Sequence, residues 1–192
     1  LRDGEGHLWL STNAGIARFT PETGMIKRFG VEDGLQSMEF NAGASFRNDS
    51  GDMFFGGVRG LNVFSPDILS ENPHPPKVTI TGFRLFNKPV TVGEHSPLRQ
   101  AICVTEVIDL PYNQNSMSFE YVGLHFSAPQ KNQYAYRLEG LEDDWTMAGN
   151  RRIAIYTNIP PGSYTFHVRA ASSDGIWNDE GAQLRIRIHP PW

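Results

Sequence analysis

Carboxylate side chains gather in one short segment, and their chemistry is the first to consider. Glu139, Glu142, Asp143 and Asp144 stand close together in the sequence. Glycoside hydrolysis needs two carboxyl groups that face each other across a cleft, one of them with a raised pKa. We expect four acids in one hydrophilic turn to lie in water instead, with a weak divalent-ion site as the lesser alternative, because hard cations bind oxygen-rich loops. We therefore predict no catalytic residue in this segment.

The remaining chemistry-bearing residues show no spacing that would hold a metal ion or a phosphate. The sequence contains no HExxH or GxSxG motif, and the glycines of residues 56–60 lack the Lys-Ser/Thr of a phosphate loop. A single cysteine, Cys103, excludes an internal disulfide and a CxxC redox pair, and we expect it as a small apolar side chain in a strand. We expect no cofactor and no metal ligand. Surface or strand positions are expected for all six histidines: His7, His74, His95, His125, His167 and His189.

Charge and composition exclude two further classes of function. The chain has 17 basic and 21 acidic residues, and the basic residues are scattered. Nucleic-acid and anionic-membrane surfaces need clustered Lys and Arg, so neither partner is expected. No stretch approaches the roughly 18 apolar residues of a membrane span, and the polar start Leu1–Gly4 is no signal peptide. We expect a fragment of a longer protein, trimmed at both ends.

Two segments of the chain repeat each other at an offset of 45 residues. Gly6–Glu22 aligns without a gap with Gly51–Asp67, and Gly, Gly, Phe and Pro fall on Gly, Gly, Phe and Pro. Each copy predicts a turn, an aromatic strand, a glycine turn and a second strand. Short strands in repeats of about 40–45 residues are typical of β-propeller blades. Residues 1–72 therefore predict the end of a propeller, with fewer than two blades present.

An incomplete propeller has consequences for packing. Trp9 and Phe54 occupy equivalent places in the two copies, which favours a role for both in the core between blades over a role in stacking on sugars. Open strand edges tend to pair. We therefore expect the orphan strands to pack on a second copy of the chain or on its own second domain.

A proline-rich linker separates the repeats from a second domain, residues 73–192. Pro73, Pro75 and Pro76 stiffen the chain and remove backbone donors. After them, alternation of apolar and polar residues predicts about seven short strands and no amphipathic helix, the pattern of an immunoglobulin or fibronectin type III sandwich. These strands are expected at residues 78–86, 104–110, 116–124, 134–138, 153–157, 164–170 and 184–188. The predicted fold class is all-β throughout.

Three sequence blocks in the second domain carry a resemblance to a known family. They are Tyr134–Trp145, Tyr156–Phe166 and Ala170–Asn178. In this order they resemble the three-tyrosine (Y_Y_Y) domain, and the upstream copies are similar to two-component regulator propeller repeats. The resemblance implies the periplasmic sensor region of a bacterial histidine kinase, a hybrid two-component protein or a diguanylate cyclase. It also implies a transmembrane helix after His189–Trp192.

The residues of these blocks are expected to act mainly in packing and turns. Pro161 and Gly162 should form a tight turn that starts a strand, and Trp145 should cap the core. Asp174 and Gly175 should form a turn in which the Asp side chain bonds the backbone. The predicted structural motif residues are Tyr134, Tyr136, Trp145, Tyr156, Pro161, Gly162, Tyr164, Asp174, Gly175 and Trp177.

Three functions remain open from the sequence. The first is a non-catalytic spacer that transmits a ligand signal from the propeller to the membrane helix, within a receptor homodimer. The second is a fibronectin-like module that itself binds an oligosaccharide, which an exposed row of aromatic residues would favour. A cryptic hydrolase is the least supported of the three. The expected partners are therefore the missing blades, the membrane helix, a second copy and an oligosaccharide.

Overall fold

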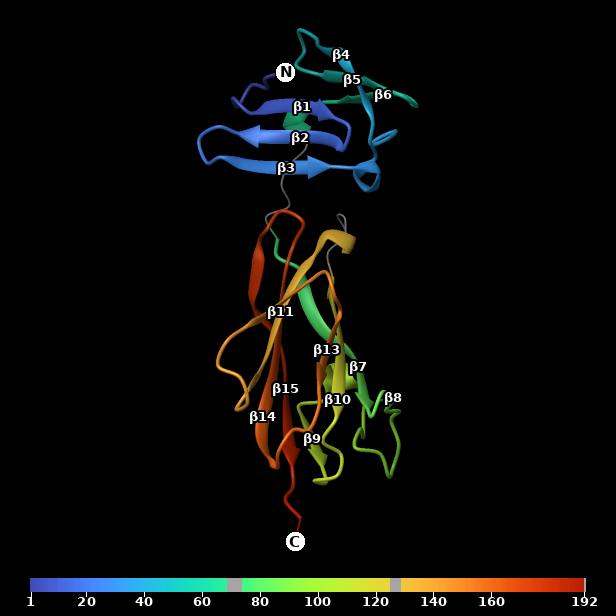
Figure 1. Ribbon diagram of the computed structural model, residues 1–192, viewed down its shortest axis with the longest axis vertical. Coiled ribbons are helices and arrows are strands. Elements are labelled where there is room, and N and C mark those ends of the chain that lie inside the picture. Colours follow the sequence, from blue (N-terminus) through green and yellow to red (C-terminus); the bar gives the residue numbers. More distant parts are fainter. Residues whose placement is uncertain (69–73, 125–128, 192) are drawn as a thin grey trace. The chain divides into compact units, whose positions relative to one another are not determined.

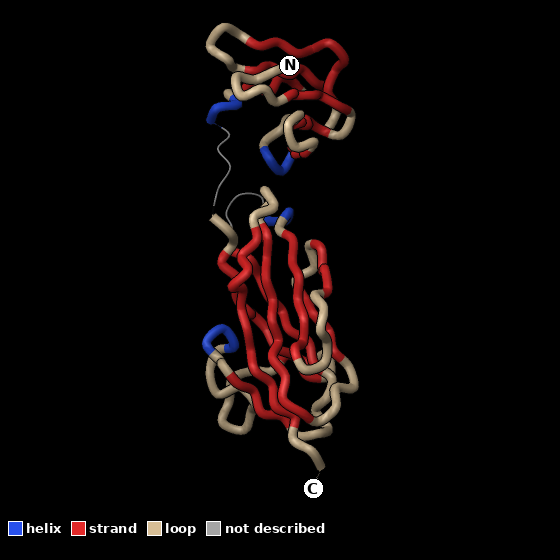
Figure 2. Tube along the Cα trace, turned by 90° about the vertical axis from the view of Figure 1, so that its left-hand side faces the viewer, coloured by secondary structure: helices blue, strands red, loops and turns tan. Residues whose placement is uncertain are grey.

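The computed structural model describes residues 1–68, 74–124 and 129–191 of the chain (Figure 1). It divides into two compact units, residues 1–71 and 72–192, which are described here one at a time. The boundary predicted between residues 72 and 73 lies outside the described residues, as do Pro73, His125 and Trp192. The all-β class is confirmed, since strands and loops make up most of the described chain (Figure 2). Helical segments there are short 3-10 turns: Val31–Asp33, Pro66–Ile68, Ile102–Val104 and Pro129–Lys131.

Unit 1 contains two three-stranded antiparallel sheets. The first sheet has the order β1-β2-β3 and the second the order β4-β5-β6. Because adjacent strands are also consecutive in sequence, each sheet is a meander closed by tight turns (Figure 1). The strands are β1 (Leu8–Thr12), β2 (Gly15–Thr20), β3 (Met25–Phe29), β4 (Phe40–Arg47), β5 (Met53–Gly57) and β6 (Gly60–Phe64).

The two sheets share one hairpin, which repeats at the offset found in the sequence; the third strand follows this hairpin in the first sheet (β3) and precedes it in the second (β4). Strand β5 starts 45 residues after β1, and β6 starts 45 residues after β2. The residue before each turn also pairs with the first residue of the strand after it: Arg2 pairs with Leu8, and Arg47 pairs with Met53. The glycines that end the turns before β1 and β5 also agree, because Gly6 and Gly51 have φ angles of 96° and 93°. A left-handed φ of this kind favours glycine, which explains why the repeat keeps it.

The core of unit 1 lies between the two sheets, where one face of each is buried. Its buried members are Trp9, Ile16, Leu35, Phe40, Met53 and Phe55, with Leu1, Phe29 and Phe64 packed against them. The expectation that Trp9 and Phe54 share this core is half wrong. Trp9 is 2% exposed, but Phe54 is only half-buried, and its neighbours Met53 and Phe55 point inward instead. Successive side chains of a strand point to opposite faces, so the two copies bury opposite faces.

Unit 2 contains a four-stranded sheet, β13-β10-β7-β8, and a five-stranded sheet, β12-β11-β14-β15-β9. Both sheets contribute to one shared core. The strands of the first sheet are β7 (Lys77–Leu85), β8 (Lys88–Pro89), β10 (Met117–Leu124) and β13 (Ile153–Tyr156). Those of the second are β9 (Val107–Leu110), β11 (Gln133–Glu139), β12 (Thr146–Gly149), β14 (Gly162–Ala171) and β15 (Trp177–Ile188).

The alternation read from the sequence decides which side chains enter this core. In β15, Leu184, Ile186 and Ile188 are buried while Arg185 and Arg187 are exposed, as predicted. Phe119 and Phe166 stack across the two sheets with ring centroids 4.3 Å apart. The largest fully buried side chains of unit 2 are Tyr121, Tyr134, Phe119, Phe166, Ile108, Leu110, Leu138 and Leu184.

Strand β9 pairs with β15 in parallel, whereas the other strand pairs of unit 2 are antiparallel. Residues Val107–Leu110 lie beside Arg185–Ile188 in one continuous register. Backbone hydrogen bonds continue the pairing at both ends, from the Arg185 N–H to the Glu106 carbonyl and from the His189 N–H to the Leu110 carbonyl. The last strand of the unit is therefore held along its C-terminal end.

Two expectations about this unit need correction. The strand expected at residues 104–110 begins only at Val107, because Ile102–Val104 forms a 3-10 turn. Cys103 lies in that turn and is exposed, so it is not a buried strand residue. The short edge strand β12 was not predicted, since its four residues include Gly149 and carry no alternation.

Candidate functional site

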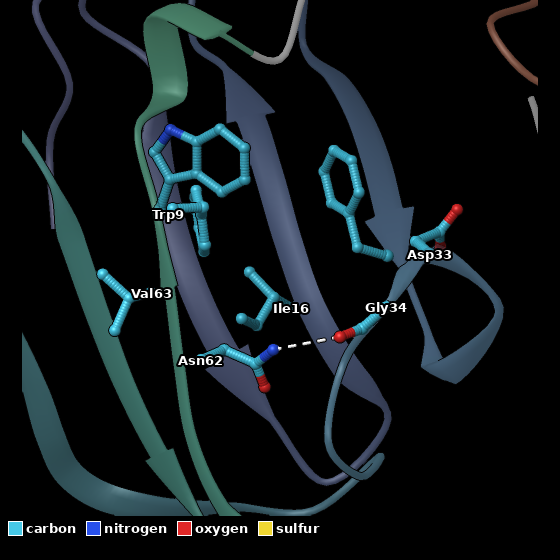
Figure 3. A pocket seen from close by; sticks show the side chains of 8 residues that line it. Trp9, Ile16, Asp33, Gly34, Asn62 and Val63 are labelled. Carbon is cyan, nitrogen blue, oxygen red and sulfur yellow. Dashed lines mark hydrogen bonds between the residues drawn. The ribbon is translucent and has the colours of Figure 1, made fainter.

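Unit 1 contains a small pocket between its two sheets (Figure 3). Its volume is about 150 Å³. Trp9 and Ile16 line it from the first sheet, and Asn62 and Phe64 from the second. Its aromatic wall comprises Trp9, Phe29 and Phe64, with ring centroids of Trp9 lying 5.4 Å and 5.0 Å from those of the two phenylalanines.

The polar groups that line this pocket are used to hold the chain together. The Asn62 side-chain oxygen accepts a hydrogen bond from the Gln36 N–H at 3.0 Å, and its amide nitrogen donates to the Gly34 carbonyl at 3.2 Å (Figure 3). Asp33 accepts a hydrogen bond from the Gly30 N–H at 2.7 Å. The bond of Asp33 lies within the connection between β3 and β4, and the two bonds of Asn62 join that connection to β6. We therefore interpret the pocket as a gap in the packing between the two sheets and not as a ligand site.

The turn that precedes β1 depends on one buried carboxylate. Asp3 is 8% exposed and accepts hydrogen bonds from the backbone N–H groups of Glu5 and His7 and from the Trp9 indole at 2.8 Å. Burial acts to raise the pKa of Asp3, but the hydrogen bonds from Trp9 and His7 outweigh it and hold that pKa below its ordinary value. Asn48 occupies the equivalent place in the second copy and accepts the same bond, from the Asp52 N–H at 2.8 Å.

The tyrosines of the three sequence blocks lie in or against the core of unit 2. Tyr134 and Tyr156 are buried, and Tyr136 packs against the same cluster. Tyr121, which the sequence placed on the same strand face as Phe119, joins them with its ring 5.3 Å from that of Tyr134. Burial raises the pKa of Tyr121, so that hydroxyl stays protonated. The four rings thus form one aromatic layer between the two sheets.

One hydrogen-bonded carboxylate joins the two sheets of unit 2. The Tyr156 hydroxyl, on the four-stranded sheet, donates to Glu142 Oε2 at 3.0 Å. The same oxygen accepts the Leu138 N–H, on the five-stranded sheet, at 3.0 Å. Burial, together with the Glu142 carboxylate, raises the pKa of Tyr156. Glu142, expected to lie in water, is therefore half-buried and structural, because the tyrosine hydroxyl gives it a partner.

Tyr164 closes the turn at Pro161 and Gly162. Its hydroxyl donates to the Pro160 carbonyl at 2.9 Å, four residues upstream. The ring lies so close to Gly162 that a Cβ there would come within 2.9 Å of the Tyr164 hydroxyl, so a larger residue would displace the ring. Strand β14 begins at Gly162, two residues before the start expected at residue 164. The Tyr164 hydrogen bond therefore holds the turn through which the chain enters β14, the strand that pairs with β15.

Trp145 does not cap the core, contrary to expectation. It is half-buried and lies on the outer face of the five-stranded sheet, where β11 and β14 place their polar side chains. The guanidinium carbons of Arg137 and Arg169 lie 5.0 Å and 4.4 Å from its ring, and Arg169 also lies 5.0 Å from the ring of Trp177. Cation–π attraction explains this position. We name Arg137, Trp145, Arg169 and Trp177 the Arg–Trp ladder.

Acidic residues border the ladder and pair with basic residues of the same sheet. His167 Nε2 lies 2.7 Å from Glu139 Oε2, and Arg169 Nη1 lies 2.9 Å from Asp179 Oδ1. In the turn that follows β14, Ser172 Oγ accepts the backbone N–H groups of Asp174 and Ile176. Ser172 was not predicted in this role.

No group of three or more metal-ligating side chains occurs within residues 1–68, 74–124 and 129–191. The four acids of residues 139–144 do not face each other across a cleft, because Glu142 bonds Tyr156 and Glu139 bonds His167. Across the same described ranges, the helical segments are too short to cross a membrane.

Comparison with known proteins finds that the chain is similar to parts of two-component signalling proteins. A family model described as the Y_Y_Y domain matches residues 125–189. Histidine kinase P4 of Formosa agariphila is 37% identical over 194 residues, a match that covers 100% of this chain and 14% of that protein. The Y_Y_Y resemblance expected from the three tyrosine blocks is thereby confirmed.

Solved structures show similarity to the same class of protein. The extracellular domain of BT3049, named as a hybrid two-component system of B. thetaiotaomicron, is 30% identical with a TM-score of 0.82, over 99% of this chain and 26% of that one. The extracellular domain of BT4673 from the same organism, at 24% identity and a TM-score of 0.57, shares the fold. Both are extracellular domains, in agreement with the expected location outside the cytoplasm. The chain spans only a minor part of the length of each relative.

Proposed function

We propose that this chain, a homologue of a histidine kinase with a Y_Y_Y domain at residues 125–189, is a non-catalytic part of a periplasmic sensor. It transmits a ligand signal from a β-propeller to a transmembrane helix and onward to a histidine kinase or diguanylate cyclase output. The observation that carries this proposal is the match of 99% of the chain to one extracellular sensor domain at a TM-score of 0.82. The partners are then the rest of the same receptor and a second receptor copy.

Unit 1 supplies consecutive propeller repeats in this proposal. The hairpins β1-β2 and β5-β6 share strand starts, register and turn glycines at an offset of 45 residues, and the two sheets pack face to face. Propeller blades are small antiparallel sheets of this kind, arranged radially. Two sheets cannot close a ring, so further repeats of the intact receptor complete the ligand site.

Unit 2 supplies an immunoglobulin-like sandwich. Two sheets share its core, and the Tyr164 hydroxyl bonds the backbone four residues upstream. A tyrosine that bonds back to its own corner in this way is a recurring feature of immunoglobulin-like folds. The bonds of Glu142 to both sheets tie them together. Unit 2 therefore passes on a movement of its neighbour as a rigid body.

The alternative function, a carbohydrate-binding fibronectin-like module, receives less support. Sugar binding of that kind needs aromatic rings with an open face. Tyr134, Tyr136 and Tyr156 pack in or against the core, and the ring of Trp145 contacts two guanidinium groups. A transmitter needs no such open rings, so the packing favours it.

The experiment is glycan-array binding by the complete outer region of the receptor beside this chain. We expect binding by the complete region and none by residues 1–192. A matched variant of the complete region, Tyr156→Phe, should bind normally and signal less to the output domain, because it loosens the link between the sheets. Binding by residues 73–192 alone would instead support the carbohydrate module.

A further inference from the structure

The chain leads into the first strand of unit 2 through a proline that is buried and hydrogen-bonded. Pro76 directly precedes β7 and is buried, whereas His74 and Pro75 before it are exposed. The Pro76 carbonyl oxygen accepts a hydrogen bond from Asn178 Nδ2 at 2.9 Å. Asn178 is the second residue of β15 and lies 102 residues further along the chain. The residue before the first strand of unit 2 is therefore bonded to the start of its last strand.

A glycine of β10 gives Pro76 its place against the core. A Cβ at Gly123 would come within 3.3 Å of Pro76 Cβ and 3.1 Å of Ala170 Cβ, so a side chain there would crowd both. The Gly123 N–H donates to the Tyr134 hydroxyl at 3.1 Å, and its carbonyl accepts from Asn132 Nδ2 at 3.0 Å. Asn132 and Tyr134 are both 0% exposed. Buried hydrogen bonds therefore fix the backbone on which Pro76 packs.

A second hydrogen bond fixes the orientation of the Asn178 amide. Asn178 Oδ1 accepts the Gly181 N–H at 3.1 Å, so the amide oxygen faces an N–H group while the amide nitrogen faces the Pro76 carbonyl. Gly181 lies in a bulge of β15, residues 179–181, where the register against β14 shifts. An aspartate in place of Asn178 would keep the acceptor for Gly181 and lose the donor to Pro76.

Beyond the bulge, β15 runs as a continuous strand to the opposite end of unit 2 (Figure 1). From Ala182 to Ile188 it pairs with β14 in one register, and Arg185–Ile188 also pair with β9 on the other side. Leu184, Ile186 and Ile188 are buried in the core between the sheets. One strand held on both sides therefore connects the end of unit 2 at which Pro76 is bonded with the end at which Ile188 lies.

We propose that Asn178 is a positioning residue that joins the start of β7 to the start of β15, so that Pro76 and β15 move as one element. A displacement that reaches Pro76 is then passed along a single strand to Ile188. This contact specifies where a movement enters unit 2, and its part in signalling rests on the transmitting role proposed above. The contact itself is measured on the 192-residue chain without a ligand, so its failure and a failure of the transmitting role give different results.

The test measures the position of the entering chain relative to β15 by double electron–electron resonance. Nitroxide labels are attached at His74→Cys and Arg187→Cys, which are exposed positions before Pro76 and on β15. The exposed native thiol is removed by Cys103→Ser in every variant. A reference pair, Gln133→Cys with Arg187→Cys, joins two strands of the five-stranded sheet and omits the entering chain. We expect a narrow distance distribution for both pairs when Asn178 is present.

Asn178→Asp is the decisive substitution, because it keeps the size of the side chain and the acceptor for Gly181 but places an oxygen against the Pro76 carbonyl. The distance distribution between positions 74 and 187 should broaden, while the reference distribution stays narrow. Hydrogen exchange of the backbone amides of residues 77–79 should become about tenfold faster, as expected for the loss of one buried hydrogen bond.

Asp179→Asn is the matched control on the neighbouring residue of β15. It removes the charge that pairs with Arg169 at 2.9 Å and leaves the bond between Asn178 and Pro76 intact. Both distance distributions and the exchange of residues 77–79 should then equal those of the chain with Asp179.

Four results would overturn the proposal. A broad distribution between positions 74 and 187 in the chain with Asn178 shows that the entering chain is not held. Unchanged distances and exchange in Asn178→Asp show that the bond to Pro76 does not hold it. Broadening of the reference distribution as well makes Asn178 a residue of the strand fold and not of the contact. An equal effect of Asp179→Asn assigns the change to the charge of the bulge.

Discussion

The two units bury their apolar side chains in different ways. Unit 2 has two sheets of unlike sequence whose inner faces close one core, and the outer face of its larger sheet carries the Arg–Trp ladder. Unit 1 has two sheets that share one repeated hairpin, and each sheet is apolar on both faces. A repeat has to pack on its neighbours from both sides, because a single repeat cannot enclose a core of its own. The comparison shows that two sheets of a sandwich enclose a core between them and need no further sheet, whereas two sheets of a repeat leave apolar outer faces.

The largest effect is expected from a truncation in the closed core of unit 2. Phe166 is 0% exposed and stacks on Phe119, so Phe166→Ala should lower the free energy of unfolding of unit 2 by about 3–5 kcal/mol. Hydrogen exchange measured by mass spectrometry resolves the two units. Protection of unit 1 should not change, and an equal loss in both units would contradict their separate cores.

A matched pair at equivalent positions tests the two faces of the repeat. Trp9→Ala should lower the free energy of unfolding of unit 1 by about 3 kcal/mol, because it opens a cavity and removes the indole donor to Asp3. Phe54→Ala should cost about 1 kcal/mol in the monomer, since that ring is only half-buried. Urea unfolding of both variants at low concentration gives the comparison. Equal losses would show that Phe54 is covered as fully as Trp9.

Removal of one hydroxyl group tests the link between the sheets of unit 2. Tyr156→Phe leaves the half-buried Glu142 without its hydroxyl donor and should cost about 1–3 kcal/mol. The pKa of Tyr156 is raised by burial and by Glu142, so its contribution is complete below about pH 10 and is lost as the pH rises through the folded-state value.

Urea midpoints measured across the alkaline range provide the check. The unmodified unit 2 should lose stability above about pH 10, and Tyr156→Phe should lose less over the same range. The remaining loss in the variant is assigned to Tyr121, whose pKa is also raised by burial. Identical losses of stability in the two proteins above about pH 10 would show that ionisation of Tyr156 does not destabilise unit 2.

The smallest effect is expected at the turn of unit 1, and it has the opposite pH dependence. Asp3→Asn should cost about 1 kcal/mol at neutral pH, because Asn48 forms the equivalent turn but the charged acceptor for Trp9 is lost. The pKa of Asp3 is lowered, so its contribution is present above the ordinary value of 3.8 and disappears as the pH falls through the folded-state value. The variant and the unmodified chain should therefore converge in acid, as measured by unfolding of unit 1.

Sequence patterns predicted most of this fold, and the failures share a physical cause. The turn glycines, the apolar alternation and the prolines are local, and they placed the repeats and most of the strands of unit 2. Which face of a repeat is buried is not local, because Leu8, Trp9 and Leu10 are all large and apolar. Only the position of the neighbouring sheet decides that Trp9 points inward.

The functional residues that sequence reasoning missed also depend on distant partners. Trp145 lies outside the core because Arg137 and Arg169 contact its ring on the outer face, and these two arginines are far from each other in the sequence. Glu142 was expected in water with the other three acids, but the Tyr156 hydroxyl, which donates to it, lies on another strand. Strand β9 is defined by its pairing with β15, far along the chain. A faint signal for Glu142 existed, since it is the acid nearest to the strand that ends at Glu139.

The parallel pairing of β9 with β15 has a mechanical consequence. A force that draws Ile188 outward along β15 is directed nearly along both strands, whereas the bonds between them run across. The pairs from Arg185 to Ile188 and the flanking bonds of Glu106 and Leu110 would then resist together, in shear. A hairpin pulled at its open end yields one pair at a time. The last strand of unit 2 is thus built to bear tension at its end without peeling away.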